Sequence, residues 1–98
     1  MTINVVQWAT GGVGRAAVAA IAAHPDLELV GCWVHTPEKV GRDVGELCGI
    51  APLGVTATDD VDALLALGAD CVVYSPVMAD PTVVARILAS GADVVTPL

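Results

Sequence analysis

The sequence predicts an α/β fold with a doubly wound parallel sheet of about five strands and helices on both faces. Short segments rich in β-branched residues alternate with segments of helical periodicity along the 98 residues. The strand-like segments are largely apolar on both faces, as expected of parallel strands that helices cover from either side. Crossover connections between such strands are right-handed, so successive units extend one sheet. No repeat or linker interrupts the pattern, and we expect one domain over residues 1–98.

The first half of the chain contains the best-defined elements. Ile3–Trp8 has the composition of a strand, and a glycine cluster separates it from a helical stretch over about Gly12–Ala23. The dipeptide His24-Pro25 stops this helix. Leu27–Val34 is a second strand, and the irregular stretch after it leaves room for a short helical turn near Asp43–Leu47.

The second half continues the alternation with shorter elements. The expected strands are Val55–Ala57, Asp70–Ser75 and Asp93–Thr96. The helix between the first two begins after the caps Thr58-Asp59-Asp60 and ends at Gly68. The next helix begins at Asp80-Pro81, a cap residue followed by a proline in the first turn, and ends at Ser90-Gly91. Its buried stripe is expected to consist of Val83, Val84, Ile87 and Leu88.

Composition and charge exclude several classes of protein. The chain is 55% hydrophobic and 15% charged, which excludes disorder. Its net charge of −7, with only four Lys and Arg residues, argues against a nucleic-acid partner, because phosphate contacts need many cations. The longest apolar run, Ala16–Ala23, is too short to cross a bilayer, and no secretory signal is recognisable, so we expect a cytoplasmic protein without a membrane partner. The three cysteines match no metal or redox spacing, and no metal site is predicted.

The turn after the first strand is the strongest functional feature. It reads Ala9-Thr10-Gly11-Gly12-Val13-Gly14, followed by Arg15. In an open parallel sheet this turn lies at the carboxyl ends of the strands, where glycines let a pyrophosphate approach the N–H groups of a helix N-terminus. Gly11 and Gly14 fill the second and third positions of the Rossmann-type Gly-x-Gly-x-x-Gly pattern. Ala9 replaces the first glycine, which fits if the backbone keeps a negative φ. A glycine turn without a ligand is the plainer interpretation, and the strand–turn–helix context favours a dinucleotide over it.

The end of the second strand bears on the choice between NAD and NADP. NAD-binding domains usually place an acidic residue there for the ribose 2′-hydroxyl, but this chain has Val34-His35-Thr36, with Lys39 and Arg42 in the next loop. Together with Arg15, three of the four cations flank the expected adenosine ribose, which favours a 2′-phosphate and hence NADP. Glu38 lies nearby and leaves NAD as the alternative. A solvated loop of mixed charge explains the same residues without a ligand.

His35 leaves three roles open, namely a ribose-phosphate contact, a stacking partner of adenine and a plain surface histidine. It lies at the adenosine end of the expected site, far from any nicotinamide, so we do not interpret it as a catalytic base. No Ser-His-Asp arrangement can be assembled from the sequence.

These residues resemble the N-terminal domain of the dihydrodipicolinate reductase family, and more closely its relatives that act on amines, such as 2,4-diaminopentanoate dehydrogenase and the amine dehydrogenases. The glycine turn over Trp8–Gly14 carries one part of the resemblance. The run Val40–Leu47, with its Gly-x-Asp-x-Gly-Glu-Leu spacing after the second strand, carries the more specific part. Gly54-Val55-Thr56 before a short acidic helix start also fits, and the resemblance spans nearly the whole chain.

The resemblance implies a nicotinamide cofactor, NADP or NAD, whose pyrophosphate lies on the glycine turn. It implies that the loops after the fourth and fifth strands face the nicotinamide, which here means Ser75-Pro76 and Thr96-Pro97. Capping a helix or closing a turn are alternative roles for Ser75 and Thr96. The segment Val77-Met78-Ala79 either packs beside the ring or fills space.

The resemblance also implies an oxidoreductase that moves hydride between the nicotinamide and a C=N or C=O carbon. In that family the acid–base groups and the substrate pocket come mainly from a second domain after the fifth strand. We therefore expect a substrate domain after residue 98, a homo-oligomer in the full-length form, no catalytic residue within this chain, and cofactor binding without turnover by the isolated domain. A non-catalytic nucleotide- or coenzyme A-binding regulatory module is the alternative from another class, and an interaction module with a vestigial site is a third.

Overall fold

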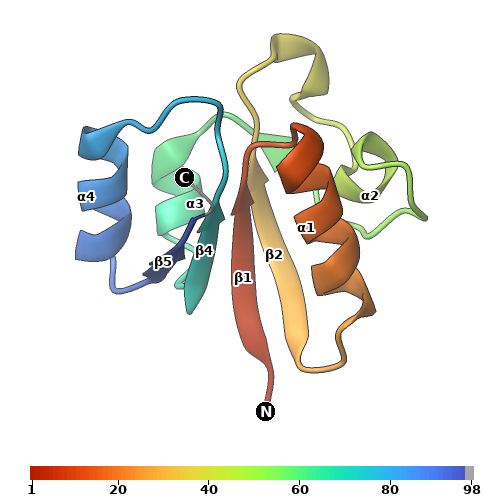
Figure 1. The fold of residues 1–98 in the computed structure, drawn as a ribbon, viewed down its shortest axis with the longest axis horizontal. Helices are drawn as coiled ribbons and strands as arrows, with labels where there is room; N and C mark the ends of the chain where they lie inside the picture. Colours follow the sequence, from red (N-terminus) through yellow and green to blue (C-terminus); the bar gives the residue numbers. More distant parts are fainter. Residues whose placement is uncertain (97–98) are drawn as a thin grey trace.

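A computed structural model describes residues 1–96 and contains one five-stranded sheet (Figure 1). The elements along the chain are β1 (Ile3–Trp8), α1 (Gly12–Ala23), β2 (Leu27–Trp33), the 3-10 turn η1 (Pro37–Lys39), α2 (Val44–Leu47), β3 (Ala57–Thr58), α3 (Val61–Leu65), β4 (Cys71–Tyr74), α4 (Pro81–Ala89) and β5 (Asp93–Val95). The strand order is β3-β2-β1-β4-β5, and every pairing between these strands is parallel. The predicted doubly wound parallel sheet is confirmed.

The strand order changes direction at β1. The chain first adds β2 and β3 on one side of β1, then crosses over and adds β4 and β5 on the other side. In a doubly wound sheet, the carboxyl ends of the strands at such a switch point border a crevice that binds ligands. Here that point lies between β1 and β4, at the upper edge of the sheet in Figure 1, where α1 begins.

Helices cover the two faces of the sheet as separate layers. On one face, α1 and α2 pack over a core that includes Val5, Val18 and Val44. On the other face, α3 and α4 pack over a core that includes Val6 and Ile87. Neighbouring residues of β1 therefore point into opposite cores, as the two-residue period of a strand requires. This arrangement explains why the predicted strands are apolar on both faces.

Two local predictions are wrong. Leu88, expected in the buried stripe of the last helix, is 55% exposed, whereas Ile87 is completely buried. Consecutive helical residues point about 100° apart, so the short α4 directs only one of the two at the sheet. The third strand is Ala57–Thr58 instead of Val55–Ala57. The preceding residues pair with the start of α2 and its cap: Asp43 forms an isolated bridge with Thr56, and the N–H of Val44 donates to the carbonyl of Val55.

The cysteines behave as buried apolar side chains. Cys32 and Cys48 are buried and Cys71 is half-buried. Burial raises the pKa of the Cys32 thiol to about 12, so the thiol stays protonated at neutral pH.

Within residues 1–96, no group of three His, Cys, Asp or Glu side chains is placed to hold a metal ion. None of the helices over the same residues is long and apolar enough to span a bilayer.

Candidate dinucleotide-binding site

A hollow of about 520 Å³ lies at the carboxyl edge of the sheet, at the switch point. Its lining comes from the turn after β1 (Ala9, Thr10, Gly11), from the end of β2 and the loop after it (Trp33, His35, Thr36, Lys39), and from the loop after β4 (Pro76, Val77, Met78). The loops that follow three neighbouring strands thus lie together at this edge of the sheet. This is the location predicted for the ligand.

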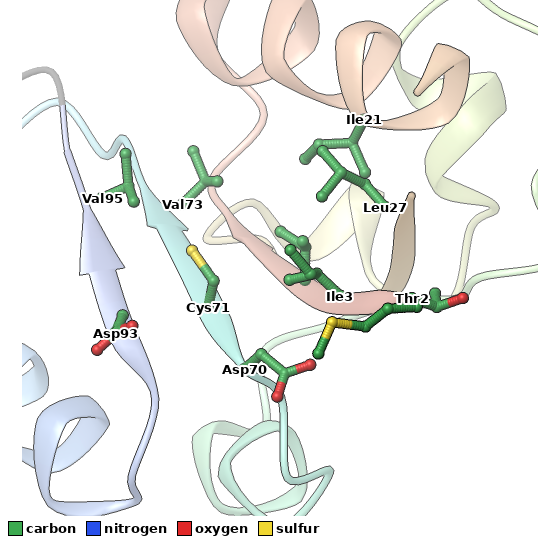
Figure 2. A pocket seen from close by; sticks show the side chains of 11 residues that line it. Thr2, Ile3, Ile21, Leu27, Asp70, Cys71, Val73, Asp93 and Val95 are labelled. Carbon is green, nitrogen blue, oxygen red and sulfur yellow. The ribbon is translucent and has the colours of Figure 1, made fainter. Parts of the chain in front are cut away.

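A second hollow, of about 590 Å³, lies over one face of β1, β4 and β5, beside α1 (Figure 2). Its wall is mostly apolar and includes Ile3, Val73 and Val95. The charged side chains in its lining are the carboxylates of Asp70 and Asp93, which repel an anionic ligand. Although this hollow is the larger of the two, we place the candidate site at the carboxyl edge, because a dinucleotide needs donors and cations for its phosphates.

The glycines of the turn after β1 have two different tasks. A Cβ on Gly14 would collide with the carbonyl group of Ala9, so a side chain is excluded there by the fold itself. A Cβ on Gly11 or Gly12 would meet no protein atom within 4 Å, so these glycines border open space. Gly11 is the N-cap of α1 and has no side chain that could accept from the N–H groups of the first turn. The N–H groups of the first turn of α1 are therefore left for an anion.

Ala9 adopts the left-handed conformation, with φ at +81°. The condition under which the sequence-based prediction accepts an alanine here, a negative φ, is therefore not met. The turn is fixed from both sides, because the N–H of Ala9 donates to the carbonyl of Trp33 at 2.8 Å and its own carbonyl accepts from Nε2 of Gln7 at 2.9 Å. The residue at the first position of the glycine pattern thus has a backbone conformation that favours glycine. For an alanine, this conformation costs about 1 to 2 kcal/mol of conformational strain.

Of the three cations predicted near the adenosine ribose, Lys39 alone lines the hollow. Its Nζ donates to Oγ1 of Thr10 at 3.0 Å. Arg15 reaches from α1 toward the segment after α2, where its Nη2 would lie 3.5 Å from a Cβ on Gly49. Arg42 is exposed outside the lining, and its backbone carbonyl accepts from the N–H of Ala57. Within the described part of the chain, no carboxylate lines the hollow.

Trp33 and His35 form the wall of the hollow on the β2 side. The rings of Trp8 and Trp33 lie nearly parallel, with centroids 5.5 Å apart, and His35 continues the series with its ring 6.0 Å from that of Trp33. Trp33 was not predicted as a site residue. The available signal was its position as the last residue of a strand that ends at the switch point.

The loops after β4 and β5 contribute unequally. Pro76, Val77 and Met78 line the hollow. Ser75 lies next to it and bonds inward, because its Oγ accepts from Nε2 of Gln7 at 2.8 Å and donates to the carbonyl of Trp8 at 3.3 Å. Thr96 follows β5 and is not part of the lining, and Pro97 lies outside the described residues. The predicted cofactor contacts of Ser75 and Thr96 stay predictions.

Residues of the Gly-x-Asp-x-Gly-Glu-Leu run stabilise the loop that contains it. Asp43 caps α2 by accepting from the N–H of Glu46, and it also accepts from the N–H groups of Leu53 and Gly54 at 3.0 and 2.8 Å. Desolvation raises the pKa of Asp43, but backbone donors, chiefly Leu53 and then Glu46 and Gly54, outweigh it and lower the pKa overall. A Cβ on Gly45 would collide with the carbonyl of Ala51. Asp43 and Gly45 of this run therefore stabilise the loop between β2 and β3.

Comparison with known proteins decides the family. Residues 3–95 match the family described as "Dihydrodipicolinate reductase, N-terminus". The chain belongs to this family. It is 48% identical over 104 residues to an amine dehydrogenase of Streptomyces virginiae, covering 97% of this chain and 28% of that protein. It is 46% identical over 63 residues to a 4-hydroxy-tetrahydrodipicolinate reductase of Synechocystis sp., covering 64% of this chain and 23% of that protein.

Solved structures agree with this assignment. The amine dehydrogenase from Mycobacterium smegmatis superimposes with a TM-score of 0.83 and 30% identity, over 98% of this chain and 30% of that one. A Rex-family repressor shares the fold, with a TM-score of 0.75 and 17% identity, so the fold alone does not separate an enzyme from a regulator. The chain spans less than a third of the length of the amine dehydrogenases.

The family prediction is confirmed, and with it the class. The chain is a Rossmann-type, nicotinamide-dinucleotide-binding domain of the dihydrodipicolinate reductase-like oxidoreductases and their amine dehydrogenase relatives. The regulatory alternative shares only the fold with this chain.

Proposed function

We propose that this chain binds NADP(H) across the carboxyl edge of its sheet and serves a hydride transfer between the nicotinamide and a C=N or C=O carbon. One observation carries the proposal. In the hollow at the switch point, the glycine turn after β1 faces Lys39 from the loop after β2, and the described lining contains no carboxylate. The pyrophosphate would lie on the uncapped N-terminus of α1, where backbone N–H groups and the helix dipole favour negative charge.

The adenosine end supports NADP over NAD. Lys39 and Thr36 line the hollow where an acidic residue would be needed to bind a free 2′-hydroxyl. An ammonium group has three donors, so Lys39 keeps its bond to Thr10 and still binds a 2′-phosphate. The preference depends on Lys39 rather than on all three predicted cations, because Arg15 and Arg42 are outside the lining. His35, whose ring is tilted 33° to that of Trp33 at a centroid distance of 6.0 Å, lines the hollow and is proposed to contact the adenine.

The nicotinamide end is formed by apolar side chains. Val77 and Met78 are 96% and 82% exposed, and both line the hollow next to Pro76. We assign to them the packing of the nicotinamide ring. Hydride transfer is the chemistry that the bound cofactor supplies, and the residues of this chain bind and orient it. The acid–base groups, the substrate pocket and the homo-oligomer contacts are assigned to a further domain, and the cytoplasmic location stays a prediction.

The experiment is a set of nitrogen–proton NMR titrations of the 98-residue chain with NADPH, NADH and coenzyme A. We expect NADPH to shift the amide resonances of Thr10, Gly11, Gly12 and Lys39, and to leave those of Ile3 and Val95 in the second hollow unchanged. Shifts confined to the second hollow, or no shifts with either nicotinamide dinucleotide, would contradict the proposal. Binding of coenzyme A in place of NADPH would favour the regulatory alternative.

A further inference from the structure

Gln7 is a polar side chain in the middle of the sheet. It lies on β1 between Val6 and Trp8 and is completely buried. Its Oε1 has no hydrogen-bond donor among the described residues. Burying an amide oxygen without a partner is unfavourable, and an apolar side chain of similar size would avoid the penalty. Packing therefore does not explain a glutamine at this position.

The contacts of the Gln7 amide nitrogen do explain it. Nε2 donates to the carbonyl of Ala9 at 2.9 Å and to Oγ of Ser75 at 2.8 Å. Ser75 in turn donates to the carbonyl of Trp8 at 3.3 Å. One buried amide thus ties together the end of β1, the start of the glycine turn and the loop after β4.

The Ala9 carbonyl is the critical point of the turn. It belongs to the residue with φ at +81°, and Gly14 of α1 packs so closely against it that a Cβ would collide. A shift of this carbonyl would therefore move the start of α1, whose N-cap Gly11 lines the hollow. Glycine adopts a positive φ without strain, but alanine does not. The alanine at this position needs an external contact to stay there.

We propose that Gln7 is a positioning residue that holds the Ala9 carbonyl, and with it the dinucleotide turn, in the left-handed conformation. The inference rests on the proposed function, since the turn is taken to bind the dinucleotide. It also gives Ser75 a role as a partner of Gln7 behind the site. Gln7 and Ala9 together then hold the positive φ that a glycine at the first position of the pattern adopts without help.

The test is a double-mutant cycle between Gln7→Met and Ala9→Gly. Methionine keeps the length and apolar fit of the side chain but has no donor. We expect Gln7→Met to weaken NADPH binding about fivefold to tenfold, the range of one lost hydrogen bond. In the Ala9→Gly background the same Gln7→Met change should cost less than about twofold in affinity, because glycine needs no contact to hold a positive φ.

A purely structural role predicts a different result. In that case Gln7→Met lowers the melting temperature and leaves the dissociation constant of the folded protein unchanged in both backgrounds. Either an unchanged affinity or an equal loss in both backgrounds overturns the proposal. Should Gln7→Met not fold, Gln7→Asn replaces it in the cycle, since its amide is one methylene too short to keep both contacts.

A readout without ligand separates this inference from the proposed function. The N–H of Ala9 donates to the carbonyl of Trp33, so its hydrogen exchange reports on the turn in the free chain. We expect Gln7→Met to speed exchange at Ala9 about fivefold to tenfold and Ala9→Gly to reverse the change at residue 9, again the range of one hydrogen bond. Equal exchange in all variants overturns the inference. A wild-type chain that binds no dinucleotide defeats the proposed function, and the exchange comparison still decides the role of Gln7.

Discussion

The Nζ of Lys39 lies 3.0 Å from Oγ1 of Thr10, which joins the loop after β2 to the glycine turn after β1. Both side chains line the hollow at the switch point. The contact places one positive charge at the adenosine end of the site, in a chain of net charge −7. The proposed preference for NADP therefore depends on this single contact.

Lys39→Met should weaken NADPH binding about tenfold and NADH binding less than about twofold. A charged hydrogen bond is worth about 1.5 kcal/mol or more, and only NADPH has the phosphate that receives it. Calorimetric titration with both nucleotides measures the difference. Arg86→Met is the matched control, because it removes the same charge on α4, where Arg86 pairs with Asp62. Equal losses for both nucleotides would show that Lys39 does not contact a 2′-phosphate.

Gly14→Ala should lower the free energy of unfolding by about 1 to 3 kcal/mol, the usual cost of overpacking. The new methyl group meets the backbone of Ala9, which cannot move without disturbing the turn. Denaturant unfolding of the chain measures the loss. Gly12→Ala, two residues earlier in α1 with open space around its Cβ, serves as the control and should be neutral or slightly stabilising. Similar stabilities for the two variants would contradict the close packing.

Gly11→Val should have the opposite signature to Gly14→Ala. No protein atom lies within 4 Å of a Cβ at Gly11, so the fold should lose only about 1 kcal/mol of stability, the cost of a poorer N-cap residue. The open space is where we place the pyrophosphate, and a branched side chain there should abolish detectable NADPH binding. Melting curves and titrations on the same sample test the two halves of this prediction. Retained binding would move the phosphate away from the turn.

Asp43→Asn should reduce the pH dependence of stability on the acid side. The folded-state pKa of Asp43 lies below its ordinary value of about 3.9, so its contribution is fully present above that value and is lost as the pH falls through the folded-state pKa. Denaturant unfolding between about pH 2 and pH 6 should therefore give a smaller drop in stability for the variant. Asp59→Asn, which removes an exposed carboxylate before α3, is the control. Parallel curves for Asp43→Asn and the wild type would remove Asp43 as a source of acid sensitivity.

The sequence was sufficient for the fold because local signals were consistent along the chain. Ile3–Trp8 and Gly12–Ala23 match the observed β1 and α1 in both bounds, since a glycine cluster and a His-Pro pair mark their ends. The third strand was displaced because its position depends on pairing with a distant segment. Leu88 was misplaced because apolar periodicity does not tell which of two adjacent residues faces the sheet.

Most of the residues that line the hollow were predicted from the sequence, but the side chains that support them were missed. Ala9, Thr10, Gly11, His35, Thr36, Lys39 and Pro76 were all predicted and line the hollow. Trp33 and Gln7 were missed, because their roles arise from strand register, which sets Trp33 beside Trp8 and Gln7 beside β4. The positive φ of Ala9 could not be inferred, since it depends on bonds to Trp33 and Gln7.

The most direct test of the central claim is the ratio of the dissociation constants for NADH and NADPH, measured by calorimetry on the wild-type chain at one ionic strength. We expect NADPH to bind about tenfold more tightly, because Lys39 offers a 2′-phosphate a charged donor and the described lining offers a 2′-hydroxyl no carboxylate. Equal affinities, or tighter binding of NADH, would contradict it.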